Sequence, residues 1–218
     1  MTCRDLYIMG CGGLGRELFC VIQDLPQWHV VAYVDVDEKD GTTARARGIV
    51  LPVIGESKFE RLCHEQVEGD DRINLVIGIG SPVARHRIAE KYLSLCTFPN
   101  IIHPTTLITG EVIFGQGNVI IPYSMLSDNI HIGSFNLLNG QIAVGHDAII
   151  GDANVIMPAC NISGNVIIGN QNLIGAKAFV LQGKSIGNNN TIGTGSVLLR
   201  IVHDSETWCG NPAQKIKF

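Results

Sequence analysis

Residues 144–168 read VGHDAIIGDANVIMPACNISGNVII and repeat one pattern every six residues. The first place of each hexad is aliphatic: Val144, Ile150, Ile156, Ile162 and Ile168. The register extends in both directions, with an aliphatic or aromatic residue at every sixth position from Ile102 to Leu198. Because an α-helix repeats every 3.6 residues, a period of six excludes a helix. The pattern predicts a β-helical solenoid for the second half of the chain.

Two further features accompany the repeat. Glycine follows the large apolar residue in many hexads: Gly115, Gly133, Gly145, Gly151, Gly169, Gly175, Gly187 and Gly193. Small or turn-compatible residues recur two places before the large apolar residue, for example Asn118, Asn136, Asn154, Asn172 and Asn190. We expect three short strands per coil, with the apolar residues inside a triangular prism and the coils stacked by strand pairing. Glycine and asparagine at the corners would tolerate positive φ.

The composition limits the class of protein. The 218 residues suffice for one or two domains of roughly 100 residues each. No stretch approaches the ~18 apolar residues of a membrane-spanning helix, and the N-terminus does not resemble a signal peptide, so we expect a cytoplasmic protein without a membrane partner. A net charge of −4 without a Lys/Arg cluster argues against nucleic acid as a binding partner. Seven scattered cysteines without a CxxC pair argue against disulfides and against a metal site.

In the first hundred residues, short apolar runs alternate with segments whose apolar residues have helical spacing. We expect strands near 6–9, 29–36, 51–54 and 75–80, and helices near 16–22, 57–63 and 82–95. Strands interleaved with helices predict a parallel sheet. The expected fold class is therefore α/β plus all-β, with a small N-terminal Rossmann-like parallel α/β domain in residues 1–100 and a parallel β-helix in residues 101–218.

A glycine-rich turn lies at the start of this first domain. Gly10-x-Gly12-x-x-Gly15 follows a strand and opens a helix, which is the context of a phosphate-binding turn. Asp35 ends the second strand, where an acid can hold a ribose or a base. Because the domain has room for about one mononucleotide half, we favour a single nucleotide diphosphate over NAD. The competing interpretation is a glycine turn that only packs the helix on the strand.

His146 and Asp147 are the candidate catalytic pair. They lie between the inward residues Val144 and Ile150, so both side chains fall on an outward turn. A neighbouring carboxylate can select the tautomer of an exposed histidine and stabilise its protonated form, which suits a general base. The competing interpretation is an ordinary solvated turn residue.

Four more segments complete a set of motifs: IGSPVARHRI (79–88), IIHPTT (101–106), GHDAIIGD (145–152) and GNPAQKI (210–216). In this order, over essentially the whole chain, they closely resemble the hexapeptide-repeat sugar O- and N-acetyltransferases typified by PglD and NeuD. Perosamine N-acetyltransferases are similar. The resemblance implies a left-handed β-helix, a homotrimer, and acetyl-CoA bound between neighbouring prisms.

The resemblance also implies roles for individual residues. It makes His146 the catalytic histidine and Asp147 its acid. It places the nucleotide sugar at Gly10, Gly12, Gly13, Asp35, Gly80, Ser81 and Arg85. It places acetyl-CoA at Gly164, Ala176, Thr194, Gly210 and Pro212, with no metal.

Three positions depart from the family pattern. Leu14 and Val155 stand where the family has histidines that help to shape the sugar pocket, and Gln214 interrupts the usual Ala-Lys pair near the C-terminus. The sequence therefore leaves the sugar, the nucleotide base and the pathway open.

The favoured function is acetyl-CoA-dependent N-acetylation of a nucleotide-linked amino sugar, such as a UDP-4-amino-4,6-dideoxy sugar, by direct transfer with His146 as the base. One alternative is an O-acetyltransferase that acts on a sugar hydroxyl, as in sialic acids. The other is a non-catalytic protein that binds a nucleotide sugar.

Overall fold

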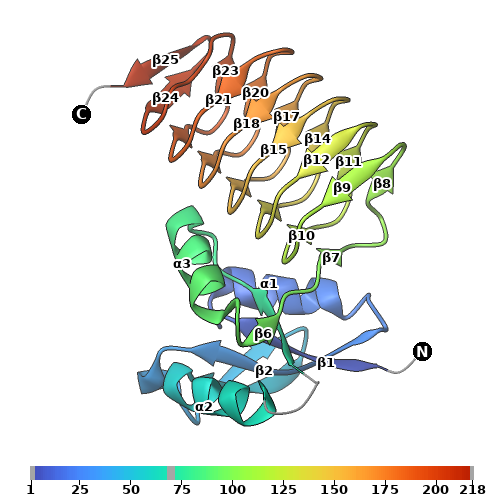
Figure 1. Cartoon of the computed structure of the whole chain (residues 1–218), viewed down its shortest axis with the longest axis vertical. Helices are drawn as coiled ribbons and strands as arrows, with labels where there is room; N and C mark the ends of the chain where they lie inside the picture. The colour runs from blue at the N-terminus through green and yellow to red at the C-terminus, as the bar shows by residue number, and fades with distance from the viewer. Residues whose placement is uncertain (1–2, 68–71, 217–218) are drawn as a thin grey trace. The chain divides into compact units, whose positions relative to one another are not determined.

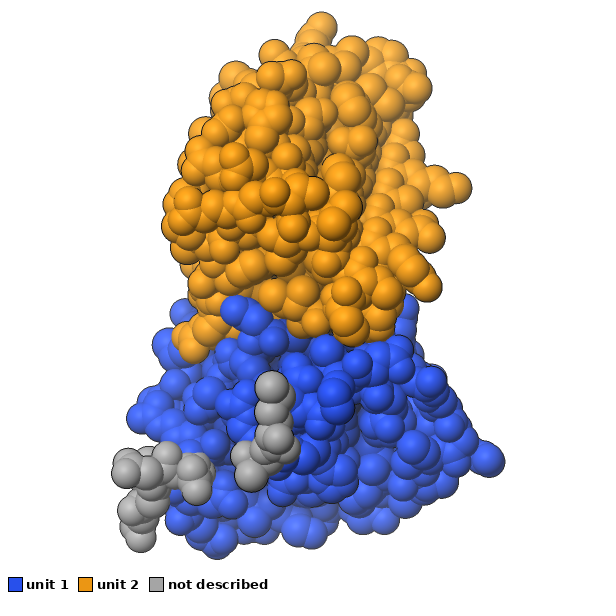
Figure 2. Space-filling model, turned by 90° about the vertical axis from the view of Figure 1, so that its right-hand side faces the viewer, with its two compact units in different colours: residues 1–80, 87–101 blue, residues 81–86, 102–218 orange. Residues whose placement is uncertain are grey.

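The computed structural model describes residues 3–67 and 72–216. The chain divides into two compact units, which Figure 2 colours separately. The first contains Met1–Gly80 and Arg87–Ile101, and the second contains Ser81–His86 and Ile102–Phe218. The short Ser81–His86 segment thus groups with the second unit, whereas the sequence suggested one division near residue 100. In the described part of the chain, no helix is long and apolar enough to cross a membrane.

The first unit is built around a six-stranded sheet with the order β3-β4-β2-β1-β5-β6. In chain order the elements of this part of the chain are β1 (Arg4–Met9), α1 (Gly13–Ile22), β2 (Trp28–Asp35), the 3-10 helix η1 (Asp37–Lys39), β3 (Thr43–Ala46), β4 (Ile49–Gly55), α2 (Glu56–Val67), β5 (Ile73–Ile77), α3 (Pro82–Tyr92) and β6 (Cys96–Thr97). The residues of α3 up to His86 group with the second unit, and those from Arg87 with the first. All pairs are parallel except β3 with β4. The parallel sheet agrees with the prediction, and the β3–β4 hairpin is an addition that the strand pattern did not indicate.

The second unit is a prism of stacked coils with three faces (Figure 1). The first face contains β7 (Ile101–Ile102), β10 (Val119–Ile120), β13 (Leu137–Leu138), β16 (Val155–Ile156), β19 (Leu173–Ile174), β22 (Thr191–Ile192), β24 (Thr207–Gly210) and β25 (Ala213–Ile216). The second contains β8 (Leu107–Ile108), β11 (Met125–Leu126), β14 (Ala143–Val144), β17 (Asn161–Ile162), β20 (Phe179–Val180) and β23 (Val197–Leu198). The third contains β9 (Val112–Phe114), β12 (Ile130–Ile132), β15 (Ile149–Ile150), β18 (Ile167–Ile168) and β21 (Ser185–Ile186).

The hexad residues form the core of this prism, as the sequence predicted. From Ile120 to Leu198, every sixth residue is at most 2% exposed. Strands pair in parallel with the equivalent strand of the next coil, so that Leu126 pairs with Val144 and Ile132 with Ile150. Each inward side chain therefore packs against the inward side chains of the coils on either side of it.

The corners differ from the expectation. Every sixth residue from Gly117 to Gly195 has a φ between +53° and +70°, three places before the inward residue. Most residues there are neither glycine nor asparagine; Tyr123, Phe135 and Lys177 are examples. The glycines that follow the inward residues are not left-handed, so the predicted reason for them was wrong. They are needed because the coils approach closely: a Cβ on Gly145 would lie 2.5 Å from the backbone nitrogen of Gly164.

The recurring asparagines also lie outside the left-handed positions. They form a buried ladder, with Asn118, Asn136, Asn154, Asn172 and Asn190 each at most 1% exposed. The Asn154 side chain donates to Asn136 Oδ1 at 3.0 Å and to the Gly169 carbonyl at 2.9 Å. Its own Oδ1 accepts hydrogen bonds from the backbone and side-chain nitrogens of Asn172, both at 2.9 Å. This rung thus satisfies polar groups of the coils on both sides.

Replacing Asn154 with Ala removes one rung and leaves buried donors and acceptors without partners. We expect the free energy of unfolding to fall by about 1–3 kcal/mol, the usual cost of unsatisfied buried groups. Chemical denaturation measures this change. Asn161→Ala, at an exposed strand position, is the control and should change stability by less than about 0.5 kcal/mol. Equal effects of the two substitutions would show that the ladder does not stabilise the prism.

Candidate active site

His146 lies at the corner between β14 and β15, where the second face turns into the third. Its side chain is 54% exposed and that of Asp147 is 42% exposed. The inward residues on either side, Val144 and Ile150, are buried and anchor this corner to the core. The outward position expected from the hexad register is therefore observed.

Hydrogen bonds orient the His146 ring. Its Nδ1 lies 2.6 Å from Asp147 Oδ2, and the Asn129 side-chain amide donates to Asp147 Oδ1 at 2.6 Å. The bond with His146, followed by the bond from Asn129, lowers the pKa of Asp147, which is therefore ionised at neutral pH. Because an ionised carboxylate only accepts, Nδ1 carries the hydrogen and Nε2 presents its lone pair. Nε2 can then accept a proton from another molecule.

The backbone at this corner repeats that of the preceding coil. Asp147 has φ +57° and Asn129, its counterpart one coil earlier, has φ +54°. Asp and Asn are the side chains that most readily adopt this conformation after glycine. The Asp147 N–H also donates to the Asp128 carbonyl at 3.0 Å, which fixes the corner against the coil before it.

Gly164 occupies the equivalent corner position of the following coil. A Cβ on Gly164 would lie 2.6 Å from Nε2 and 2.7 Å from Cε1 of His146. Even an alanine would therefore displace the imidazole. Of the five residues predicted to hold acetyl-CoA, Gly164 is the one that the structure places beside His146.

The other four predicted CoA residues lie at two further places in the second unit. Ala176 and Thr194 occupy successive positions at the corner between the first and second faces, where the Gly195 N–H donates to the Ala176 carbonyl at 2.8 Å. Gly210 is the last residue of β24, and Pro212 lies in the tight connection between β24 and β25. These two groups and Gly164 thus mark three separate parts of the prism surface.

A cavity of about 390 Å³ lies within the first unit, at the carboxyl ends of its central strands. Its volume is in the range of small-ligand sites. Five of the predicted nucleotide-sugar residues line it: Gly10, Gly12, Gly13, Asp35 and Gly80. Leu14 also lines the cavity. Val155, the second residue that departs from the family pattern, is fully buried on β16 of the second unit.

Asp35 holds the glycine-rich turn in place. Its Oδ2 accepts the Cys11 N–H at 2.9 Å, while its Oδ1 accepts the Val36 N–H at 2.9 Å and lies 3.0 Å from Lys39 Nζ. Burial raises the pKa of Asp35, but the hydrogen bonds from Cys11, Lys39 and Val36 outweigh it and lower the pKa. The carboxylate is therefore ionised and braces the turn from the end of β2.

Two predicted substrate residues are not in this cavity. The Ser81 hydroxyl accepts the Ala84 N–H at 3.4 Å at the start of α3. Arg85 is fully buried in the second unit, where its Nε donates to the Phe135 carbonyl at 2.8 Å. Burial lowers the pKa of Arg85 to about 9. Arg85 thus lies against a corner of the prism and not in the cavity.

Three charged residues of the cavity were missed in the sequence: Lys39, Glu56 and Arg87. Glu56 directly follows β4, so the rule that ligands bind at the carboxyl ends of parallel strands would have pointed to it. Lys39 lies in the 3-10 helix after β2. Arg87 comes from α3, and no local pattern distinguishes it from Arg85.

A family of known proteins matches the first part of the chain. Residues 5–92 match the family of the PglD N-terminal domain. No curated protein sequence matches the chain. This family match covers the strands and helices that build the cavity.

Solved structures match both units of the chain. Perosamine N-acetyltransferase from Caulobacter crescentus, in complex with CoA and GDP-perosamine, is 26% identical, with a TM-score of 0.87 over 98% of this chain and 97% of that one. The acetyltransferase domain of PglB from Neisseria gonorrhoeae is 26% identical, with a TM-score of 0.82 over 98% and 100%. WeeI from Acinetobacter baumannii is 26% identical, with a TM-score of 0.83 over 98% and 100%. These similarities confirm the predicted resemblance and the fold class, a small α/β domain followed by a left-handed parallel β-helix.

Gly164→Ala should turn the His146 ring away from its observed position, because the new methyl group would overlap it. The ring can rotate, so we expect a folded protein with shifted His146 ring signals in NMR spectra. Gly193→Ala is a matched control, since its Cβ would also lie 2.6 Å from a side-chain atom, Cys209 Sγ, at a position that does not contact the ring. Unchanged His146 signals in Gly164→Ala would contradict the contact.

Proposed function

We propose that this protein transfers the acetyl group of acetyl-CoA to the amine of a nucleotide-linked amino sugar. The observation that carries the proposal is the oriented His146–Asp147 pair on a β-helix corner. A cavity with a glycine-rich turn in the first unit supports the nucleotide part. The similarity to perosamine N-acetyltransferase bound to CoA and GDP-perosamine supports both substrates.

The proposed reaction is a direct transfer. The amine nitrogen attacks the thioester carbonyl carbon, and His146 Nε2 takes the proton that this nitrogen loses. The carbon–sulfur bond then breaks, and the thiolate of CoA leaves and takes up a proton. Asp147 keeps the ring in the tautomer that makes Nε2 the base and stabilises the imidazolium. No covalent acyl-enzyme is required.

We assign acetyl-CoA to Gly164, Ala176, Thr194, Gly210 and Pro212. A homotrimer, in which the wall of a neighbouring prism completes the groove, brings different corners of two chains to one acetyl-CoA. A backbone N–H of the neighbouring chain would stabilise the oxyanion. Exposed isoleucines in one file on the third face, Ile113, Ile149 and Ile167, support such an interface.

We assign the nucleotide to the cavity at Gly10, Gly12, Gly13, Asp35 and Gly80. A diphosphate next to the glycine-rich turn would meet free N–H groups at the start of α1. A UDP-4-amino-4,6-dideoxy sugar is the substrate class favoured by the sequence, and the relative with GDP-perosamine makes a GDP-linked sugar an equal choice for assay.

The assembly is tested by sedimentation. The wild-type protein should have three times the mass of one chain, because burial of the exposed aliphatic side chains between subunits is favourable. Ile149→Lys should reduce this mass by placing a charge in the interface. A wild-type monomer at assay concentrations would contradict the trimer.

The function is tested by the release of free CoA from acetyl-CoA in the presence of UDP-, GDP- and dTDP-linked 4-amino sugars. We expect turnover with at least one of them and a product acetylated on nitrogen, identified by mass spectrometry. His146→Ala should lower kcat by roughly 10²–10⁴-fold, the range for loss of a general base. An unchanged kcat would reject His146 as the base.

Two other results would change the proposed function itself. A product acetylated on oxygen would make the protein an O-acetyltransferase. Binding of nucleotide sugars without CoA release across the whole panel would make it a non-catalytic binding protein.

A further inference from the structure

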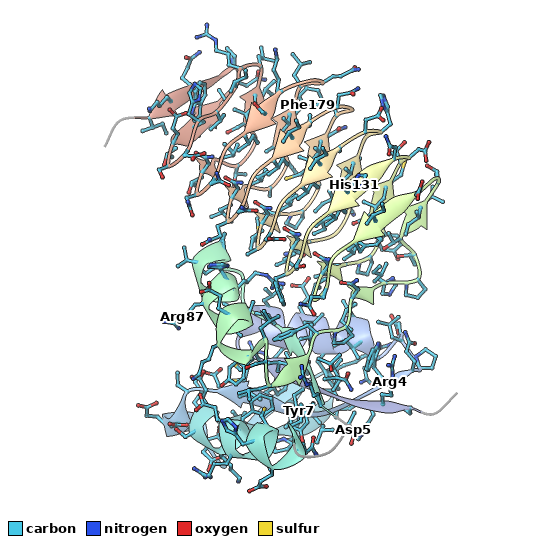
Figure 3. All side chains as sticks on the ribbon, viewed as in Figure 1. Arg4, Asp5, Tyr7, Arg87, His131 and Phe179 are labelled. Atoms are coloured by element: carbon cyan, nitrogen blue, oxygen red, sulfur yellow. The ribbon has the colours of Figure 1, made fainter. Side chains whose placement is uncertain are left out.

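Arg87 differs from the other charged residues around the cavity of the first unit. It extends from α3, where Figure 3 labels it, and lines the cavity together with the start of α1. Two acids, Asp35 and Glu56, and two bases, Lys39 and Arg87, line this cavity. Their partners decide which charge remains available to a ligand.

Both acids are already compensated. Asp35 accepts two backbone N–H groups and pairs with Lys39. Glu56 Oε1 accepts a hydrogen bond from Lys91 at 2.9 Å and another from the Tyr92 hydroxyl at 3.1 Å. Neither carboxylate needs Arg87 as a counter-ion, and both would repel an anion less than a free carboxylate does.

The other cations near the turn are also engaged. Lys39 Nζ lies 3.0 Å from Asp35 Oδ1 and 3.6 Å from Cys11 Sγ. Arg16 donates to the Cys11 carbonyl at 3.0 Å. A ligand that recruited Lys39 would have to break its contacts with Asp35 and Cys11.

Arg87 has no such contacts. Its side chain is exposed, and within residues 3–67 and 72–216 it makes no hydrogen bond or ion pair. Helix α1, which starts at the same cavity, has no acidic residue in its first turn and no side-chain cap. The cavity therefore combines one uncompensated guanidinium with free backbone N–H groups, and both favour an anion.

We propose that Arg87 binds the diphosphate of the nucleotide sugar and is the residue that makes this cavity selective for phosphorylated ligands. The inference rests on the proposed function for the nature of the ligand. The planar guanidinium forms two parallel hydrogen bonds to phosphate oxygens, and the start of α1 supplies N–H groups to the same diphosphate. The resemblance had placed Arg85 in the nucleotide-sugar site, and the proposal adds Arg87 to that site.

The test is calorimetric binding of UDP, GDP and dTDP and of the matching nucleosides, without acetyl-CoA. Arg87→Gln should weaken binding of the preferred nucleoside diphosphate by roughly 10–100-fold, as expected for lost hydrogen bonds to a charged group. Binding of the nucleoside should not change. Arg87→Lys keeps the charge without the planar fork and should fall between the wild type and Arg87→Gln.

Arg45→Gln is the matched control, because Arg45 is an exposed arginine of the same unit, on β3, and does not line the cavity. It should bind the diphosphate as the wild type does. Unchanged diphosphate binding in Arg87→Gln, or an equal loss for the nucleoside, would overturn the proposal.

Turnover assays separate this inference from the proposed function. Wild-type protein that binds a nucleoside diphosphate through Arg87 but releases no CoA would retain the inference and reject the acetyl transfer. Wild-type protein that binds none of the three diphosphates would overturn the role of Arg87 and the nucleotide part of the proposed function together.

Discussion

The stacking of one coil on the next through backbone hydrogen bonds is the constraint on which the second unit depends. Gly133, Gly151 and Gly169 each donate their N–H to a carbonyl of the following coil at 2.8 Å. At this spacing little room is left between corners, so glycine recurs after the inward residue. The left-handed corner residues have a different role, because they turn the chain from one face to the next. The backbone hydrogen bonds to neighbouring coils offset the conformational free energy that positive φ costs.

The candidate catalytic pair uses this repeating geometry without altering it. Asp147 occupies a left-handed corner position, where a carboxylate is tolerated, and Asn129 in the preceding coil holds its second oxygen. Gly164 in the following coil leaves the space that the imidazole needs. Three coils thus contribute to the site, the middle one with His146 and Asp147 and the outer two with one residue each, and the buried hexad residues keep them in register. The chemistry depends on which side chains occupy equivalent corners and requires no change in the backbone.

The cavity of the first unit is formed in a different way from the site on the prism. Its residues come from the ends of several strands and from α3, and their partners determine which of them is available to a ligand. Asp35 braces the glycine-rich turn, and Lys39 pairs with it. Arg85 and Arg87 are two residues apart on a helix, which places them about 200° apart around its axis. One is therefore buried against backbone carbonyls while the other lines the cavity.

The sequence by itself determined the β-helix, the inward register and the outward position of His146 and Asp147, because a period of six residues translates directly into faces and corners. It also predicted the parallel α/β domain and the glycine-rich turn, since both are local patterns. Only the tertiary structure decided why the glycines and asparagines recur, because the coils that they contact lie a whole turn of the prism away in the sequence. It likewise decided that Gly164 lies against His146, that Arg85 is buried, and that Arg87 faces the cavity. These outcomes depend on contacts between distant segments, which no local pattern of residues records.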